Sequence, residues 1–355
     1  MSWRAVHQFV PTLIRGDAIG DHVVRLRDQQ RRAGRRSEIF VDVERDDTAS
    51  DTHPLRRLDD HIGPDTLLVY HVAQASRCAP FLIERHEPLA LLFHNFTPVD
   101  LLAGWDPSAA CDLLDADRQL AELADRALIG ICDSQYNAER LADHGMLHTP
   151  VACIPVEVLD PTPGTAAAEV RPTVLFVGRV APNKAFHDLI AAAALLVQTV
   201  PDVEVRLVGG ETSPRYTHAL EGLISGLGMQ STVTLTGRVS DEQLTEEYRR
   251  AAVFCCLSDH EGFGVPLLEA MGHGLPVVAY DSSAVGETVG GAGLLLTDKS
   301  PAVVAATLER VLLDDALADG LRSAGLERAR SFSTERCAAE VSAALDLAWA
   351  LAGSR

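Results

Sequence analysis

The sequence predicts an α/β protein made of two doubly wound domains, and three observations lead to this fold class. The chain has 355 residues, more than a single domain usually holds. Short apolar runs alternate with amphipathic segments along both halves, and a segment rich in Pro, Gly and small residues separates the halves. Strands that alternate with helices form parallel sheets, whose carboxyl ends bind ligands in open α/β proteins.

The first half contains six apolar runs of strand length. They are rich in Val, Ile, Leu and Phe and are bounded by polar or turn residues, which is typical of buried strands. Apolar residues at helical spacing recur between them. We expect strands over residues 5–10, 37–41, 67–72, 89–94, 128–132 and 151–154, and helices over 18–33, 112–124 and 135–143.

The second half repeats this order after a linker. The linker is Asp160-Pro161-Thr162-Pro163-Gly164-Thr165, followed by Ala-rich sequence and Arg171-Pro172. Such composition without periodicity predicts a domain boundary. We expect strands over 173–177, 204–208, 232–236, 253–257, 276–279 and 293–296, helices over 185–198, 215–227, 241–250, 265–271 and 301–313, and helical structure from 314 to the end.

The composition is that of a soluble globular protein, with 47% hydrophobic and 23% charged residues. Lys and Arg number 31 against 50 Asp and Glu, and the net charge of −19 argues against general binding to nucleic-acid phosphates. Residues 1–10 lack an apolar signal core, and the longest apolar stretch, 189–197, is far shorter than the roughly 20 residues of a membrane span. We therefore expect a cytoplasmic protein.

The seven cysteines show no metal-site spacing. Several lie in apolar, strand-like runs, where free cysteine acts as a small buried hydrophobe. Together with the expected reducing compartment, this predicts that all seven are reduced core residues: Cys78, Cys111, Cys132, Cys153, Cys255, Cys256 and Cys337.

The first candidate motif is Phe176-Val177-Gly178-Arg179-Val180-Ala181-Pro182-Asn183-Lys184, which lies between an expected strand and an expected helix. Backbone N–H groups at a helix start, with two cations beside them, suit a diphosphate. A plain turn with two solvated cations is the other interpretation, and the motif alone does not decide between them. No G-x-G-x-x-G sequence is present, which disfavours a nicotinamide-dependent dehydrogenase.

The second candidate motif runs from Ser258 to Met271 and also follows an expected strand. Gly262 and Gly264 would let a ligand approach the backbone closely, and Pro266 suits the first turn of a helix. The helix dipole alone accounts for Glu269. It does not account for Glu261, which stands in a glycine-rich loop within a stretch, 251–300, that contains no arginine.

The two motifs together resemble the retaining family 4 glycosyltransferases of the GT-B fold, which carry two glutamates eight positions apart across such a loop and helix. Glu261 and Glu269 match that pair, and Gly178, Arg179 and Lys184 match the family's phosphate-binding segment. The resemblance implies two Rossmann-like domains that face a central cleft. Residues 1–160 would form the acceptor side, residues 171–330 would bind the nucleotide sugar, and a helix over 331–355 would cross back to the first domain.

The resemblance also implies roles for these residues. Arg179 and Lys184 would hold the donor diphosphate, Glu269 would accept hydrogen bonds from the ribose, and Glu261 would face the transferred sugar. Ala185-Phe186 departs from the polar or basic residues that relatives often carry after the lysine. The other donor-binding positions implied are Gly178, Gly209, Gly237, Arg238, Val239, Gly262, Phe263, Gly264 and Val265.

In the first half the resemblance is looser. Gly16, Asp17 and Gly20 correspond to a loop that lies over the donor phosphates and the acceptor in relatives, although Asp17 could instead cap the following helix. His94, in Phe93-His94-Asn95-Phe96-Thr97-Pro98, resembles the histidine that contacts the donor sugar. A structural histidine at a strand end is the alternative.

The implied reaction transfers a sugar from a nucleotide diphosphate sugar, a co-substrate rather than a cofactor, to a hydroxyl acceptor with retention of configuration. The acceptor would be a saccharide, a lipid-linked molecule or a small molecule, in cell-surface glycan or natural-product glycoside biosynthesis. No Asp-x-Asp-like segment marks a metal site, so we expect a metal-independent reaction and no nucleic-acid partner. The alternatives are a glycoside phosphorylase and a non-catalytic partner subunit, both with the GT-B fold.

Six arginines fall within twelve residues of the first half: Arg25, Arg27, Arg31, Arg32, Arg35 and Arg36. We expect them on the solvated face of the helix over 18–33. Weak contact with an anionic membrane surface is the alternative. The flanking acids Asp28 and Glu38 dilute the positive charge, which favours the solvated face.

Overall fold

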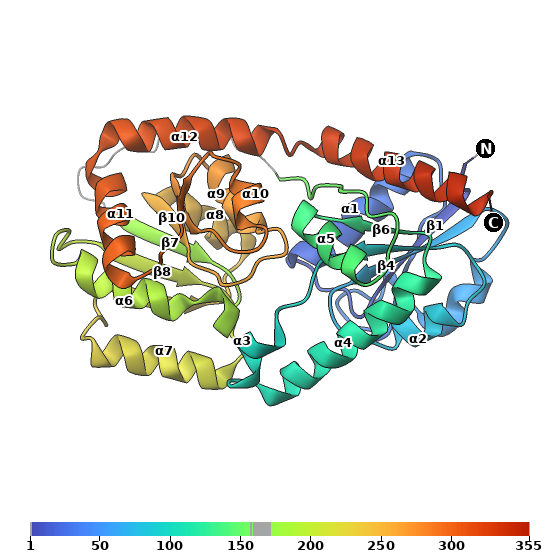
Figure 1. The fold of residues 1–355 in the computed structure, drawn as a ribbon, viewed down its shortest axis with the longest axis horizontal. Helices are drawn as coiled ribbons and strands as arrows, with labels where there is room; N and C mark the ends of the chain where they lie inside the picture. The colour runs from blue at the N-terminus through green and yellow to red at the C-terminus, as the bar shows by residue number, and fades with distance from the viewer. Residues whose placement is uncertain (1, 157, 159–171, 355) are drawn as a thin grey trace. The chain divides into compact units, whose positions relative to one another are not determined.

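The computed structural model describes residues 2–156, 158 and 172–354. The chain forms two compact units (Figure 1). Unit 1 contains Met1–Val99, Ser108–Ile154 and Thr334–Arg355, and unit 2 contains Asp100–Pro107 and Pro155–Ser333. The linker expected at 160–165 and at Arg171 lies outside the described residues. Asp100–Pro107 was expected in the first domain but groups with unit 2, where the Trp105 ring packs edge-on against Tyr216 at 5.1 Å.

Unit 1 contains a six-stranded parallel sheet in the order β3-β2-β1-β4-β5-β6. Five of its strands are buried along their whole length, as strands covered on both faces must be, whereas β3 at one edge is only partly buried. The strands are β1 (Ala5–Val10), β2 (Ile39–Val41), β3 (Thr52–Pro54), β4 (Thr66–Val72), β5 (Leu89–Phe93) and β6 (Ile129–Cys132). The helices are α1 (Ala18–Arg32), α2 (Cys78–Ile83), α4 (Pro107–Arg126), α5 (Gln135–Asp143) and α13 (Thr334–Ala352), with a 3₁₀ helix over Leu55–Asp60. Helix α3 (Val99–Ala103) begins at Val99 of unit 1, and its other residues belong to unit 2.

Helices cover both faces of this sheet. On one face, Phe9 and Leu91 pack with Leu120 of α4. On the other, Val6 packs with Leu26 of α1 and Leu345 of α13. The indole N–H of Trp3 donates to the Leu345 carbonyl at 2.9 Å, and this bond fixes α13 on unit 1.

Unit 2 contains a second parallel sheet, in the order β12-β11-β10-β7-β8-β9. Its strands are β7 (Thr173–Val177), β8 (Glu204–Val208), β9 (Val233–Gly237), β10 (Val253–Cys256), β11 (Val277–Tyr280) and β12 (Leu294–Leu296). Its helices are α6 (Phe186–Leu196), α7 (Pro214–Gly226), α8 (Asp241–Arg250), α9 (Val265–Gly272), α10 (Val285–Val289), α11 (Pro301–Leu313) and α12 (Asp315–Arg330), with a 3₁₀ helix over Pro182–Lys184. The two predicted doubly wound parallel sheets are confirmed.

One expected strand was wrong. Residues 151–154 make a single bridge, between Val151 and Cys132, instead of a strand. Pro150 and Pro155 flank this segment, and proline cannot donate to a strand ladder.

The prediction that all seven cysteines are reduced core residues was also wrong. Cys153 and Cys337 form a disulfide with their Cα atoms 5.2 Å apart. Because α13 returns to unit 1, it brings Cys337 beside a residue 184 positions earlier in the sequence. Cys111 is exposed on α4, whose outward face carries it, whereas Cys78, Cys132, Cys255 and Cys256 are free and buried.

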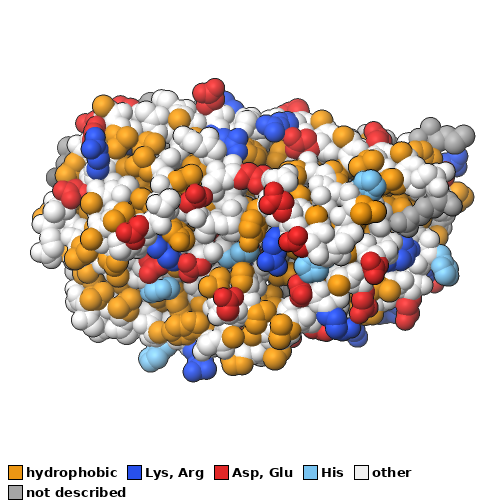
Figure 2. Space-filling model, viewed as in Figure 1, with side chains coloured by type: hydrophobic (Ala, Val, Ile, Leu, Met, Phe, Trp, Pro, Cys, Tyr) orange, Lys and Arg blue, Asp and Glu red, His pale blue; other side chains and the backbone are white. Residues whose placement is uncertain are grey.

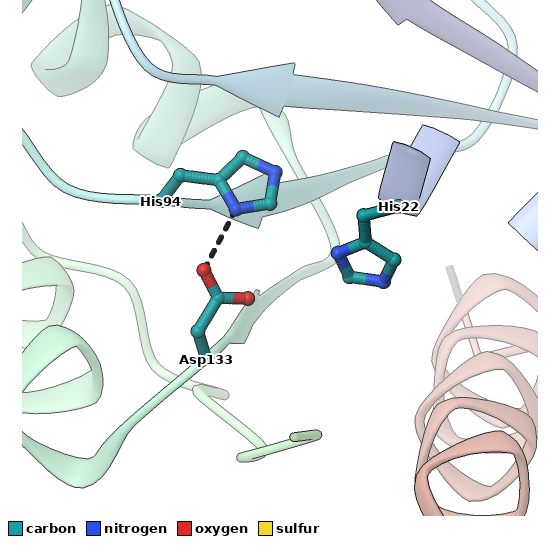
Figure 3. A group of neighbouring side chains, drawn as sticks. All are labelled: His22, His94 and Asp133. Carbon is teal, nitrogen blue, oxygen red and sulfur yellow. Dashed lines mark hydrogen bonds and ion pairs between the residues drawn. The ribbon is translucent and has the colours of Figure 1, made fainter. Parts of the chain in front are cut away.

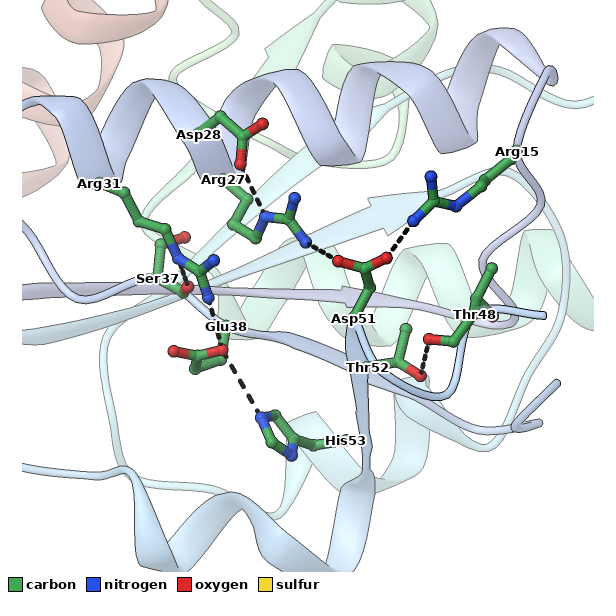
Figure 4. Close-up of polar contacts among 10 residues, drawn as sticks. All are labelled: Arg15, Arg27, Asp28, Arg31, Ser37, Glu38, Thr48, Asp51, Thr52 and His53. Carbon is green, nitrogen blue, oxygen red and sulfur yellow. Dashed lines mark hydrogen bonds and ion pairs between the residues drawn. The ribbon is translucent and has the colours of Figure 1, made fainter. Parts of the chain in front are cut away.

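No helix among the described residues is long and apolar enough to span a lipid bilayer. On the face turned to the viewer in Figure 2, acidic and basic side chains lie interspersed with apolar ones. Two of the clustered arginines are engaged inside unit 1, as Figure 4 shows: Arg27 bonds to Asp28 and Asp51, and Arg31 donates to Glu38 at 2.7 Å. Arg27 is therefore buried instead of lying on a solvated helix face. Contact with a membrane surface stays untested.

Candidate active site

The loops that follow β10, β7, β8 and β9 come from four adjacent strands of the unit 2 sheet, so they lie side by side at its carboxyl edge. They contain most of the predicted donor-binding residues. Backbone hydrogen bonds join them: the N–H of Gly178 donates to Val208, and that of Gly209 donates to the carbonyl of Gly237 at 3.1 Å.

Gly209 lets two of these loops approach closely. Its φ of +154° belongs to a region that residues with a side chain rarely adopt. A Cβ at this position would lie 1.8 Å from the carbonyl oxygen of Gly178. Gly209, one of the predicted donor-binding residues, is therefore needed for the close contact between these two loops. The next residue, Gly210, faces the loop after β9, where the Cβ of Arg238 would lie 3.8 Å from an added Cβ.

Lys184 and Glu261 are in direct contact. The Lys184 ammonium donates to both carboxylate oxygens of Glu261, at 2.6 and 2.7 Å, and both side chains are largely buried. Lys184 ends the 3₁₀ helix after β7, and Ala185 then turns the chain into α6 with a φ of +50°. The sequence placed both residues in one site but did not predict that they pair.

The backbone of Glu261 is held by a residue that the sequence analysis missed. The N–H of Glu261 lies 2.7 Å from Ser283 Oγ, which in turn donates to the Glu261 carbonyl at 2.9 Å. Ser283 has a φ of +47°, and no local sequence pattern marks that conformation. The glycine-rich loop ends at Gly264, whose φ of +89° precedes the first residue of α9.

Glu269 projects from α9 and accepts a hydrogen bond of 2.8 Å from the hydroxyl of Tyr248 on α8. Burial and the adjacent carboxylate hold the pKa of Tyr248 well above its usual value, so this hydroxyl remains a donor. Tyr248 also stacks on His273, with ring centroids 4.8 Å apart. The sequence analysis missed Tyr248 because its helix reads as a polar surface helix.

Two predicted cations lie at the rim of these loops. Arg179 is exposed and, within the described part of the chain, makes no hydrogen bond or ion pair. Arg238 is exposed on the loop after β9. Phe263 is buried in the glycine-rich loop, and its carbonyl accepts a hydrogen bond from Thr288. Gly262 precedes Phe263 in the same loop, and Val265 follows the loop as the first residue of α9. Val239 follows Arg238 in the chain.

The predicted loop of unit 1 leads into α1. Gly16 has a φ of +71°, and a Cβ on Gly20 would lie 1.8 Å from the Ile14 carbonyl oxygen. Asp17 is exposed and occupies the position before α1, but its side chain makes no capping hydrogen bond. Side-chain capping by Asp17, the alternative role, is therefore not observed.

His94 follows β5 and is bonded on both sides. Its Nδ1 lies 2.7 Å from Asp133 Oδ2, and its Nε2 lies 3.1 Å from Nδ1 of His71. His71 is fully buried, and burial with two neighbouring histidines holds its pKa well below the usual value. Both ring nitrogens of His94 therefore have protein partners, and contact with a donor sugar stays a prediction.

Comparison with known proteins relates this chain to glycosyltransferases. Residues 163–328 match the family model described as glycosyl transferases group 1. The D-inositol 3-phosphate glycosyltransferase of Kineococcus radiotolerans is 30% identical over 274 residues, covering 69% of this chain and 62% of that protein. The enzyme of the same name from Geodermatophilus obscurus is 34% identical over 275 residues, covering 70% and 59%. The chain thus spans about 60% of the length of these relatives.

Solved structures share the fold at low identity. Sucrose-phosphate synthase from Thermosynechococcus elongatus has a TM-score of 0.76 at 20% identity, covering 98% of this chain and all of that one. HepE from Anabaena, in complex with UDP, has a TM-score of 0.74 at 18% identity, covering 96% and 99%. Membership of the narrower retaining family 4 stays a prediction. The chain therefore has the GT-B fold, and its residues 163–328 match the glycosyl transferases group 1 family.

Proposed function

We propose that the protein is a glycosyltransferase that moves a sugar from a nucleoside diphosphate sugar to an acceptor hydroxyl with retention of configuration. The observation that carries this proposal is the paired Lys184 and Glu261 among the glycine loops at the carboxyl edge of the unit 2 sheet. The match of residues 163–328 to glycosyl transferases group 1 supports it. A neighbour in fold, HepE, has been solved with UDP-glucose.

The donor diphosphate would lie against the loop after β7. An ammonium carries three N–H donors, of which two face Glu261, so the third is left for a phosphate oxygen. Arg179, exposed on the same loop, would add a bidentate contact. These two cations would stabilise the charge that develops on the leaving diphosphate, and the proposed reaction therefore assigns no step to a metal ion.

The ribose would lie at Glu269 and the transferred sugar at Glu261. Tyr248 occupies one carboxylate oxygen of Glu269, and this bond fixes the side chain before the donor arrives. In the proposed reaction, the bond between the anomeric carbon and the diphosphate oxygen breaks. The acceptor oxygen then bonds to the same face of the sugar, and the acceptor proton passes to the leaving phosphate.

The proposal for the acceptor class is supported by the relatives and not by the geometry. The relatives include D-inositol 3-phosphate glycosyltransferases and the O-antigen chain mannosyltransferase B of Escherichia coli. The mannosyltransferase is 31% identical over 174 residues, which cover 46% of this chain and 42% of that protein. We propose a saccharide, lipid-linked or small-molecule hydroxyl as acceptor, and cell-surface glycan or natural-product glycoside synthesis in the cytoplasm as the setting.

A thermal-shift panel of UDP, GDP, ADP, dTDP and NAD tests the donor assignment. A ligand at about 100 times its dissociation constant adds about 2.7 kcal/mol to the free energy of unfolding, which raises Tm visibly. We expect one nucleoside diphosphate to raise Tm and NAD to leave it unchanged. If no diphosphate raises Tm, the proposal is wrong, and a rise with free phosphate and a glycan would favour a phosphorylase.

A further inference from the structure

Three side chains of types that bind metals come together inside unit 1. His22 belongs to α1, His94 follows β5 and Asp133 follows β6 (Figure 3). Each offers one ligand atom, and these atoms all lie within 4.8 Å of one another. The side chains of His94 and Asp133 are 4% and 3% exposed, and His22 is 4% exposed. The group is therefore buried and is drawn from three separate elements.

The sheet fixes two of these residues. Phe93 of β5 pairs with Cys132 of β6, so His94 and Asp133 are the next residues on two adjacent, hydrogen-bonded strands. Strand ends of a parallel sheet are rigid supports for ligating side chains. This register explains why the two side chains meet although they are 39 residues apart.

A chain of polar contacts backs the group. The amide oxygen of Gln8 lies 2.9 Å from Nε2 of His71, and Nδ1 of His71 lies 3.1 Å from Nε2 of His94. Nδ1 of His94 in turn lies 2.7 Å from Oδ2 of Asp133. These contacts hold the rings of His71 and His94 and the Asp133 carboxylate in fixed orientations.

Two further atoms favour the metal. Nδ1 of His22 and Oδ1 of Asp133 are buried and have no hydrogen-bond partner. In Figure 3 the unbonded carboxylate oxygen of Asp133 and a ring nitrogen of His22 face the same space beside His94. The contact with His94 accounts for Oδ2 of Asp133 only and leaves both of these atoms without a partner. Buried polar atoms without partners are uncommon in native proteins.

We propose that His22, His94 and Asp133 bind one divalent transition-metal ion of the Zn²⁺ type. Imidazole nitrogen and carboxylate oxygen are the ligands that such ions prefer, at about 2.0–2.2 Å. Two ligand atoms of a tetrahedral ion are about 3.4 Å apart at those bond lengths. The three ligand atoms here lie within 4.8 Å of one another, so binding of the ion would draw the side chains closer together. His71 and Gln8 would orient His94 from behind, as partners of metal-bound histidines commonly do.

The proposed ion does not depend on the proposed glycosyl transfer. Three protein ligands leave at least one coordination position for water or another oxygen ligand, as in metal sites that remain open. His94 would then act as a metal ligand, which agrees with the engagement of both its nitrogens. All measurements below are made without nucleotide, so their outcome is separate from that of the donor assignment.

Isothermal titration of the chelator-treated full chain with Zn²⁺ tests the site. We expect one ion per chain in the wild type and an affinity at least tenfold weaker in both His22→Gln and Asp133→Asn. His53→Gln is the matched control, because His53 is another unit 1 histidine beside a carboxylate, 3.5 Å from Glu38 (Figure 4). Zinc uptake that is absent from the wild type, or equal in all four proteins, would overturn the proposal.

Co²⁺ absorption provides a second measurement that does not depend on how the variants fold. In the wild type we expect d–d bands of a nitrogen and oxygen site, without the thiolate charge-transfer band that binding at the exposed Cys111 would produce. A thiolate band, or no d–d bands at one equivalent of Co²⁺, would show that the three residues are not the site.

Discussion

At the scale of single residues, the two lysines of the chain form a natural pair for comparison. Lys184 pairs with Glu261 in the candidate site, whereas Lys299 pairs with Asp188 at 2.7 Å and also bonds to Asp259. Lys184→Ala and Arg179→Ala are each expected to cost about 3–4 kcal/mol of transition-state stabilisation, because each removes a donor to the leaving diphosphate. The measurement is kcat/KM for sugar transfer. Lys299→Ala, the control, should retain turnover, and near wild-type rates in both site variants would refute the phosphate assignment.

The bond between Tyr248 and Glu269 makes a separate prediction about the nucleoside. Tyr248→Phe removes a hydrogen bond to a charged group, typically about 1.5–3 kcal/mol, and leaves Glu269 less well oriented for ribose. We expect at least tenfold weaker binding of the nucleoside diphosphate and unchanged binding of pyrophosphate, which has no ribose. Tyr70→Phe, which removes a hydroxyl bonded to Ser76 in unit 1, should affect neither ligand. Equal losses for both ligands would show that Tyr248 does not act through the ribose.

His7 predicts how stability depends on pH. Burial lowers its pKa from 6.5 to about 4, and the charged or titratable groups around it are His61, Glu38 and Arg36. Because the unfolded chain takes up this proton and the folded chain does not, stability is complete above pH 6.5 and falls as the pH drops towards 4. At pH 4 the contribution of His7 to the free energy of unfolding has fallen by about 3 kcal/mol.

Urea unfolding at pH 7 and at pH 4.5 measures this contribution. Wild type should lose more stability on acidification than His7→Gln, whose amide keeps one donor and one acceptor. The comparison uses only the difference between the two pH values, so an overall cost of the substitution does not enter it. An identical pH dependence in both proteins would contradict a buried, neutral His7.

At the scale of elements, Gly209 makes the clearest prediction. An alanine Cβ would lie 1.8 Å from the Gly178 carbonyl oxygen, so the loops after β7 and β8 would have to move apart. Gly209→Ala should cost at least about 1–3 kcal/mol of unfolding free energy and weaken nucleotide binding. Gly222→Ala is the control: it lies in α7 with nothing within 4 Å, so it should add about 0.5–1 kcal/mol. Equal stability of the two variants would show that the close approach is not required.

Elements were predictable where an apolar run or an amphipathic pattern was clearly bounded by polar or turn residues. The ranges expected for β1, β7, β8, α5, α8 and α11 agree with the structure at both ends. β3 was missed because Thr52-His53-Pro54 is short, contains proline and gains its stability from pairing with β2. The residues of the candidate site were found from their motifs, but the Lys184–Glu261 contact and the support from Ser283 and Tyr248 arise only when separate loops meet.

At the scale of the whole molecule, the disulfide joins residues 184 positions apart. It restricts the unfolded chain and ties α13 to unit 1, so we expect reduction to lower the free energy of unfolding by about 2–5 kcal/mol. Urea unfolding with and without dithiothreitol measures this change. Cys153→Ser/Cys337→Ser should match the reduced protein in both conditions, and Cys111→Ser, at an exposed free thiol, should behave as wild type. An unchanged free energy of unfolding after reduction would show that the disulfide does not stabilise the protein.

The return of α13 to unit 1 also determines how the gene should be dissected. Unit 1 consists of chain on both sides of residues 155–333, and the Cα atoms of Cys153 and Cys337 are only 5.2 Å apart. A simple truncation after residue 154 would expose the apolar surface that Leu345 and Ala348 now cover. An open reading frame that fuses Ile154 to Thr334 through a few residues would instead encode the complete core of unit 1, and the excised insert, residues 155–333, would contain all of unit 2 except Asp100–Pro107.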